Sequence, residues 1–458
     1  MTEDTIAAIA TALGEGSIAV VRVSGPKAID TVAGLFKSKT DLRKAPSHTV
    51  HYGHIADPES GQVLDEVLVT VMRAPRSYTA EDVVEVSTHG GLIAVKSVLE
   101  LILRHGARLA EPGEFTKRAF LNGRIDLAQA EAVIDLIRSR SERAFQLARK
   151  QSEGALSRQI KPLRQQLLEL LAHVEVNIDY PEHDVPEVTA AMIRDVCGRV
   201  AEKIEKLLET ANEGKILREG IVTAIVGRPN AGKSSLLNAL ARDNKAIVTD
   251  IPGTTRDIIE ETVNINGIPL RLLDTAGIRE TQDVVEQIGV QRTMDALEGA
   301  DLILLVINQN EPLHEDDRAL LEKLKERPVI VVLNKADLER RLDTAEIERL
   351  YDRRRIVSVS AKEGTGLAEL GKTVASMFFS GSVEASDLTY VSNARHVAAL
   401  HRAKRALTDA IRAAEEGLPV DFVQIDIREG WEALGEIIGD TASESLIDQI
   451  FSQFCLGK

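Results

Sequence analysis

The sequence has few cysteines, few aromatic residues and no long apolar segment. Its 458 residues include only Cys197 and Cys455, too few for a disulfide framework, which favours a reducing cytosol. One Trp, five Tyr and nine Phe make 3% of the chain, thin material for a surface that stacks bases. Purely apolar runs such as Leu302 to Ile307 have the length of a strand, so we expect no membrane span.

Positive charge is also in short supply. The chain has 56 Lys and Arg against 71 Asp and Glu, a net charge of −15. A protein that binds nucleic acid chiefly by neutralising phosphates would have a positive net charge. RNA binding by this chain would therefore need a local basic surface. The acidic start, Met-Thr-Glu-Asp, is unlike a signal peptide, and we expect a cytoplasmic protein.

The pattern of apolar residues predicts a multidomain protein. Residues 1–118 mix short β-rich runs with helical stretches, as in an α+β domain. Residues 119–219 and 382–458 show helical spacing. Residues 220–381 alternate apolar strands with helices, which predicts a parallel sheet covered on both faces. We therefore expect an all-α helical domain interrupted by an inserted α/β domain.

A complete phosphate-binding motif lies in the inserted domain. Gly227 to Ser234 matches G-x-x-x-x-G-K-S/T, after an expected strand and before an expected helix. Its glycines let backbone N–H groups approach phosphate oxygens at the helix N-terminus. Lys233 is expected to reach the β- and γ-phosphates, and the Ser234 hydroxyl to bind Mg²⁺. The alternative is a glycine turn between strand and helix that binds no ligand. The motifs that follow favour phosphate binding over this alternative.

Three further motifs stand at the ends of expected strands. Asp274-Thr-Ala-Gly277 is placed to meet magnesium and the γ-phosphate. Asn334-Lys-Ala-Asp337 offers a carboxylate for the N1–H and 2-amino donors of guanine, which adenine lacks at that edge. Ser360-Ala-Lys362 follows the next strand. In this order the motifs predict a Ras-like P-loop G domain that binds GTP.

The stretch between these motifs leaves two questions open. Thr254 or Thr255 is expected to bind Mg²⁺ in a switch loop, and spacing does not choose between them. Ras-type enzymes place a water-orienting glutamine where this chain has Ile278, so hydrolysis must use another polar group.

Four segments resemble the MnmE (TrmE) family of tRNA-modifying GTPases, which act on the wobble uridine. They are Gly227 to Ser235, Thr249 to Asp257, Glu111 to Gly123 and the ending Cys455-Leu456-Gly457-Lys458. The resemblance covers essentially the whole chain, and Leu456 is a conservative departure from the usual isoleucine. The motifs and the resemblance together give the expected GTP-binding residues: Asn230, Ala231, Gly232, Lys233, Ser234, Ser235, Thr249, Asp250, Ile251, Pro252, Gly253, Thr254, Thr255, Asp274, Thr275, Ala276, Gly277, Asn334, Lys335, Ala336, Asp337, Ser360, Ala361 and Lys362.

The resemblance also implies a metal-assisted hydrolysis. It implies K⁺ ligands at Asn230, Thr249, Ile251 and Thr254, which leaves Thr255 to join Ser234 at Mg²⁺. A cation beside the phosphates would offset charge that develops in the transition state. The expected catalytic residues are Lys233 and Glu286, the latter orienting water in place of the missing glutamine.

For the first domain, the resemblance implies a dimerising module that binds 5-formyl- or methylene-tetrahydrofolate. The positions that match its folate contacts are Arg22, Glu85, Arg124 and Lys458; each alone would pass for a surface charge. Cys455 has two readings, a reactive thiol or a packed tail residue, and Cys197 is expected in the core.

The implied partners are a second copy of the chain, GTP, tRNA and MnmG, an FAD and NADH protein. An excess of basic residues between 101 and 170 is the only local hint of tRNA binding, and a solvated helix face explains it equally well. The expected function is a K⁺-dependent GTPase that modifies C5 of the wobble uridine with a one-carbon unit from tetrahydrofolate. The alternatives are a switch GTPase in ribosome or RNA assembly without modification chemistry, and a first domain that only dimerises.

Overall fold

A computed structural model describes residues 4–179, 189–243, 261–273, 299–379 and 391–458. The chain forms two compact units. The first comprises residues 1–134, 151–197 and 409–458, and the second comprises residues 135–150 and 198–408. Within the described ranges, no helix is both long and apolar enough to span a bilayer.

The first unit begins with a seven-stranded sheet, of strand order β3-β4-β5-β6-β2-β1-β7. Neighbouring strands are antiparallel except for the parallel pair β1 and β7. The strands are β1 (Ile6–Ile9), β2 (Ile18–Ser24), β3 (Phe36–Lys37), β4 (Thr49–Ala56), β5 (Val63–Met72), β6 (Val83–His89) and β7 (Arg108–Leu109).

The two faces of this sheet differ in what covers them. Val21, Val23 and Val86 are buried in one cluster with residues of α1 (Ala28–Leu35) and α2 (Leu92–Arg104), and a short 3₁₀ turn η1 (Leu42–Lys44) adds to it. Because side chains alternate across a strand, Arg22 and Glu85, which pair in register, point to the opposite face. Near β1 this face is covered, since Ile6 and Ala8 are buried with Phe115, but over β4 and β5 it is open, and Tyr52 and Leu68 are exposed there.

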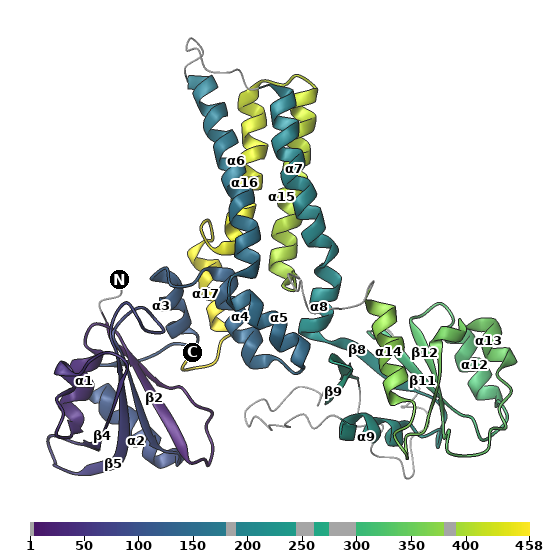
Figure 1. The fold of residues 1–458 in the computed structure, drawn as a ribbon, viewed down its shortest axis with the longest axis horizontal. Helices are drawn as coiled ribbons and strands as arrows, with labels where there is room; N and C mark the ends of the chain where they lie inside the picture. Colours follow the sequence, from purple (N-terminus) through teal and green to yellow (C-terminus); the bar gives the residue numbers. More distant parts are fainter. Residues whose placement is uncertain (1–3, 180–188, 244–260, 274–298, 380–390) are drawn as a thin grey trace. The chain divides into compact units, whose positions relative to one another are not determined.

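Helices follow the sheet and return at the end of the chain. Two of them, α6 and α16, lie side by side along much of their length (Figure 1), and Arg164 of α6 lies 4.1 Å over the Trp431 ring of α16. The helices are α3 (Glu114–Leu121), α4 (Leu127–Arg138), α5 (Glu142–Ser152), α6 (Ala155–Asp179), α7 (Ala190–Glu209), α8 (Ala211–Glu219), α15 (Ala394–Glu415), α16 (Val420–Ile438) and α17 (Glu444–Ser452). The helical spacing after Thr189 belongs to two helices, which part at Thr210.

The second unit contains a six-stranded sheet, of order β13-β12-β11-β8-β10-β9. Its strands are β8 (Ile221–Val226), β9 (Glu261–Ile265), β10 (Ile268–Leu272), β11 (Leu302–Asn308), β12 (Val329–Asn334) and β13 (Ile356–Val359). The accompanying helices are α9 (Lys233–Asp243), α12 (Glu315–Leu324), α13 (Ala345–Leu350) and α14 (Leu367–Phe378), with a 3₁₀ turn η2 (Arg353–Arg355). Alternate residues of β11 join two different cores, Leu304 in one and Leu305 in the other, so both faces are covered as expected.

The expected strands pair in parallel, and the sheet has one further strand at its edge that sequence reasoning did not name. Strand β9 pairs antiparallel with β10. Asn266 and Gly267 join them with φ angles of 51° and 82°, the left-handed conformation that a tight hairpin needs. The remaining strand pairs are parallel, so the ends of β8, β12 and β13 meet at one edge of the sheet.

Candidate functional site

The phosphate-binding loop connects β8 to α9. Gly232 has a φ of 98°, and a Cβ there would lie 2.1 Å from the Asn334 side-chain nitrogen, so only glycine fits. Asn230 also has a left-handed φ, 63°. The loop delivers the chain into the first turn of α9, whose N–H groups have no partner within the helix. This is the geometry that binds phosphate.

Lys233 opens α9 and folds back over the loop. Its Nζ donates to the carbonyl oxygens of Gly227, at 2.8 Å, and Arg228, at 2.9 Å. Burial lowers the pKa of this lysine, because the charged ammonium is partly removed from water. A bound phosphate would supply a counter-charge.

Asn334, the last residue of β12, joins two loops. Its Nδ2 donates to the carbonyl of Ala231 at 3.0 Å, and its Oδ1 accepts from the Ala361 N–H at 3.2 Å. The side chain is buried, so both bonds form away from water. Asn334 therefore fixes the phosphate loop against the loop that follows β13.

Asp337 is held by the Ser360 hydroxyl, which donates to its Oδ1 at 2.7 Å. That bond lowers the pKa of the Asp337 carboxyl, and its own backbone amide and the nearby Lys362 and Lys335 act in the same direction. Desolvation opposes them only in part. The carboxylate is therefore ionised at neutral pH and can accept two N–H donors from a base.

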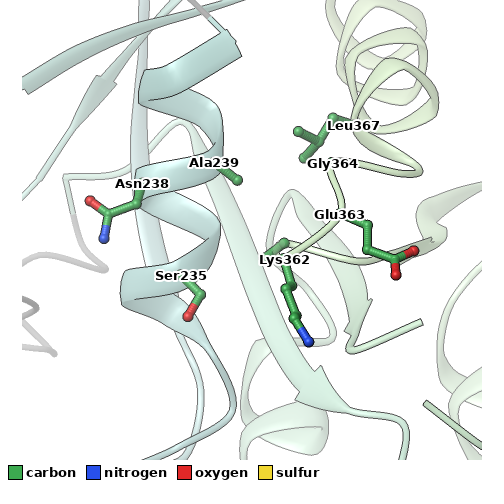
Figure 2. A pocket seen from close by; sticks show the side chains of 8 residues that line it. Ser235, Asn238, Ala239, Lys362, Glu363, Gly364 and Leu367 are labelled. Atoms are coloured by element: carbon green, nitrogen blue, oxygen red, sulfur yellow. The ribbon is translucent and has the colours of Figure 1, made fainter. Parts of the chain in front are cut away.

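A cavity of about 500 Å³ lies beside these loops, between α9 and the segment after β13. Figure 2 shows α9, with Ser235 and Ala239 on the side toward the segment that carries Lys362. Sequence reasoning named three of its lining residues and missed the rest, although Asn238 and Ala239 lie one helical turn from Ser235 and share its face. The lining residues are Ser235, Asn238, Ala239, Ala361, Lys362, Glu363, Gly364 and Leu367.

The described part of the nucleotide site thus brings together residues 230–235, 334–337 and 360–362. The other expected residues lie outside the described residues, and so does Ile278. They are Thr249, Asp250, Ile251, Pro252, Gly253, Thr254, Thr255, Asp274, Thr275, Ala276, Gly277 and Glu286.

A second cluster of charges lies on the open face of the first sheet. Arg22 Nε donates to Glu85 Oε1 at 2.8 Å, and the two side chains are only 14% and 27% exposed. Arg22 Nη1 also donates to the carbonyl of Gly457 at 3.4 Å. The pair therefore connects neighbouring strands with the tail of the chain.

The tail is docked by its backbone. The N–H groups of Gly113 and Phe115 donate to the carbonyl oxygens of Cys455, at 3.4 Å, and Lys458, at 3.1 Å. Gly457 has a φ of 87°, and a Cβ there would lie 2.2 Å from the Ile9 carbonyl. Burial lowers the pKa of Lys458, and the neighbouring Arg22 lowers it further against the opposing effect of Glu85. A bound anion would favour the protonated form.

Arg124, the fourth expected folate residue, reaches the same cluster through Tyr78. Its Nη1 donates to the Tyr78 carbonyl at 3.0 Å, and its guanidinium lies 5.1 Å from the centre of the Tyr78 ring. Arg22 lies 5.2 Å from the same ring. All four expected residues therefore belong to one cluster, in which sequence reasoning missed Tyr78.

The two cysteines differ in environment. Cys197 is buried, as expected, and burial raises the pKa of its thiol to about 12. Cys455 is exposed next to the charged cluster.

The fold and the nucleotide site define a multidomain protein with an inserted P-loop domain of the GTP-binding class. Two family descriptions match the chain: "GTP-binding protein TrmE N-terminus" over residues 5–124 and "MnmE helical domain" over residues 127–455. The chain belongs to the MnmE (TrmE) family.

Relatives match from end to end. The "tRNA modification GTPase MnmE" of Geobacillus kaustophilus is 60% identical over 462 residues, covering 100% of both chains. The protein of that name from Bacillus cytotoxicus is 58% identical over 459 residues, again covering 100% of both. Among solved structures, the G domain of the T. maritima FeoB iron transporter covers 34% of this chain and 97% of its own, at 26% identity and a TM-score of 0.26.

Proposed function

We propose that this protein is a GTP hydrolase that, together with MnmG, modifies C5 of the wobble uridine of tRNA. The observation that carries the proposal is the site that Asn334 assembles: it joins the phosphate loop to the loop after β13, whose Ser360 orients the ionised Asp337. Full-length relatives bear the name tRNA modification GTPase, which supports the same activity here. The product would be of the 5-carboxymethylaminomethyl or aminomethyl type.

Guanine selectivity follows from the chemistry of Asp337. Its carboxylate accepts two hydrogen bonds from N1–H and the 2-amino group of guanine, while adenine leaves it without donors. Hydrogen bonds to charged groups contribute about 1.5–3 kcal/mol each, so rejection of ATP should exceed a hundredfold. Comparable binding of ATP and GTP would contradict this part of the proposal.

Hydrolysis would depend on two cations. Ser234 and Thr255 would hold Mg²⁺, and Asn230, Thr249, Ile251 and Thr254 would hold K⁺. Lys233 would neutralise the β- and γ-phosphates and Glu286 would orient the water. The left-handed backbone of Asn230 supports its part, because it places this residue at the bend of the phosphate loop.

The K⁺ site can be tested by hydrolysis rates. K⁺ should accelerate the reaction and Na⁺ should do little, and Asn230→Ala should abolish the acceleration while the protein still binds GTP. Equal rates in matched K⁺ and Na⁺ buffers would remove the K⁺ site from the proposal.

The first domain would bind 5-formyl- or methylene-tetrahydrofolate in the charged cluster. Among the described side chains of the cluster, the basic groups of Arg22, Arg124 and Lys458 outnumber the acidic group of Glu85, so the cluster suits an anionic ligand. Glutamyl or formyl oxygens would meet the basic groups, and Glu85 would accept pterin N–H donors. The folate would supply the carbon for the uridine.

A second copy of the chain would cover the open face of the first sheet. Tyr52 of β4 is 59% exposed and lies opposite Leu68 of β5, which is 45% exposed. Ile18 of β2, on the same face, is 62% exposed. Exposed apolar residues gathered on one sheet face favour an interface over a solvated surface. A homodimer in the cytoplasm is the assembly we propose.

A switch GTPase in ribosome or RNA assembly would need the nucleotide site but no modification chemistry. The two functions separate in cells that lack this protein. Mass spectrometry of nucleosides from their tRNA should show the wobble uridine without its C5 group. Normal wobble modification in those cells would overturn the proposed function and leave the switch GTPase.

A further inference from the structure

Tyr78 lies at the centre of the charged cluster without being one of its charges. It belongs to the segment between β5 and β6, and its hydroxyl is 2.8 Å from the Thr116 hydroxyl of α3. The guanidinium carbons of Arg22 and Arg124 lie 5.2 Å and 5.1 Å from the centre of its ring. Both distances fall within the range in which an aromatic face attracts a cation.

The segment that carries Tyr78 is fixed to the chain around α3. The Tyr78 carbonyl accepts from Arg124 Nη1 at 3.0 Å, and the Thr79 carbonyl accepts from Asn122 Nδ2 at 2.8 Å. The ring therefore has a defined position between the strand that bears Arg22 and the turn that bears Arg124. A tyrosine has few rotatable bonds, so it can hold that position at small entropic cost.

The two arginines depend on the ring to different degrees. Arg22 is paired with Glu85 and is mostly buried, so it keeps a partner without Tyr78. Arg124 is exposed and pairs with no carboxylate among the residues that the structure describes; its contacts there are the ring and the carbonyl of Tyr78. Removal of the ring would free the Arg124 head group to sample many rotamers in water.

We propose that Tyr78 is a positioning residue of the folate site, whose ring contacts both arginines and holds the exposed head group of Arg124 near Arg22, where one folate anion can meet both. The inference rests on the proposed folate binding. It adds to the proposed site an uncharged residue, which does not pair with the charges of the ligand. Pre-organised cations bind an anion more tightly because less side-chain entropy is lost on binding. The ring acts on affinity through the two arginines.

The test is calorimetric titration of 5-formyltetrahydrofolate into the full-length protein and two variants. Tyr78→Leu keeps the apolar bulk but removes the aromatic face, and its Kd should rise roughly tenfold. Tyr78→Phe keeps the face and loses only the hydroxyl, so its Kd should stay within about twofold of the wild-type value. GTP affinity and the thermal unfolding temperature serve as controls for folding.

A double-mutant cycle separates positioning from general support of the fold. In an Arg124→Gln background, Tyr78→Leu should cost less affinity than it does alone, because the ring then has one cation fewer to hold. Full additivity, or a Tyr78→Leu protein that binds folate like the wild type, would overturn the role of Tyr78 while the folate site stands. A wild-type protein that binds no folate would overturn the proposed folate site and this inference with it.

Discussion

At the scale of single residues, the nucleotide site depends on one oriented carboxylate. The Ser360 hydroxyl both directs Asp337 and lowers the pKa of its carboxyl. Exchange of Asp337 for Asn replaces an acceptor by an amide that offers a donor. We expect GTP affinity to fall at least a hundredfold and xanthosine triphosphate, with its 2-oxo group, to become the better ligand. Competition titrations with both nucleotides measure this, and an unchanged preference for GTP would place guanine recognition elsewhere.

Lys458 would give the proposed folate site a pH dependence of predictable sign. Burial lowers the pKa of its ammonium, so the free protein loses this proton at a lower pH than an ordinary lysine does. Bound folate favours the protonated form, so affinity should fall as pH rises through that lowered pKa. Lys458→Arg, which stays charged, should give a flatter profile above neutral pH. Identical profiles for the two proteins would show that Lys458 does not carry the charge.

At the scale of elements, the sequence predicted what local pattern controls. The parallel strands of the inserted domain are continuous apolar runs, so their positions along the chain and their ends could be predicted from the sequence. The antiparallel edge strand β9 was missed, although Asn266-Gly267 between alternating apolar residues is a strong hairpin signal. The helical spacing after Thr189 gave no sign of the break at Thr210, because α7 and α8 continue the same apolar period across it.

The charged cluster shows why some site residues could not be predicted from local sequence pattern. Arg22, Arg124 and Lys458 were named only through the family resemblance, since each alone looks like a surface charge. Tyr78 had no signal at all: the carbonyl of Tyr78 bonds a residue 46 positions away, and no sequence periodicity spans that distance. Only the fold brings a strand, a turn and the chain's tail to one place.

The tail is an element whose removal can be tested. Deletion of Leu456-Gly457-Lys458 removes the carbonyl that Arg22 Nη1 bonds and the residue docked on the Phe115 N–H. We expect the truncated protein to lose 5-formyltetrahydrofolate binding and to keep its GTP affinity, because the nucleotide site lies in the other compact unit. Gly457→Ala should act in the same direction, since its Cβ would meet the Ile9 carbonyl. Calorimetry with both ligands decides it, and unchanged folate affinity would mean that the site is misplaced.

At the scale of the whole molecule, the open face of the first sheet is where two chains would meet. The face carries exposed Tyr52 and Leu68 on paired strands, and it carries Arg22 and Glu85 further along the same sheet. Because both groups share one face, an interface there would also bring folate sites close to the partner chain. Assembly and folate binding would then depend on the same surface.

Leu68→Glu tests the proposed interface, because it places a charge in the apolar patch at a residue that is exposed in the single chain. We expect the variant to run as a monomer in light scattering after gel filtration at concentrations where the wild type is a dimer, since an unpaired carboxylate buried at an interface costs several kcal/mol. Ile93→Glu is the matched control and should stay dimeric, because Ile93 is likewise apolar and exposed but lies on α2, which packs against the other face of the sheet. GTP affinity should be unchanged in both. A Leu68→Glu protein that remains a dimer would show that the two chains meet through another surface.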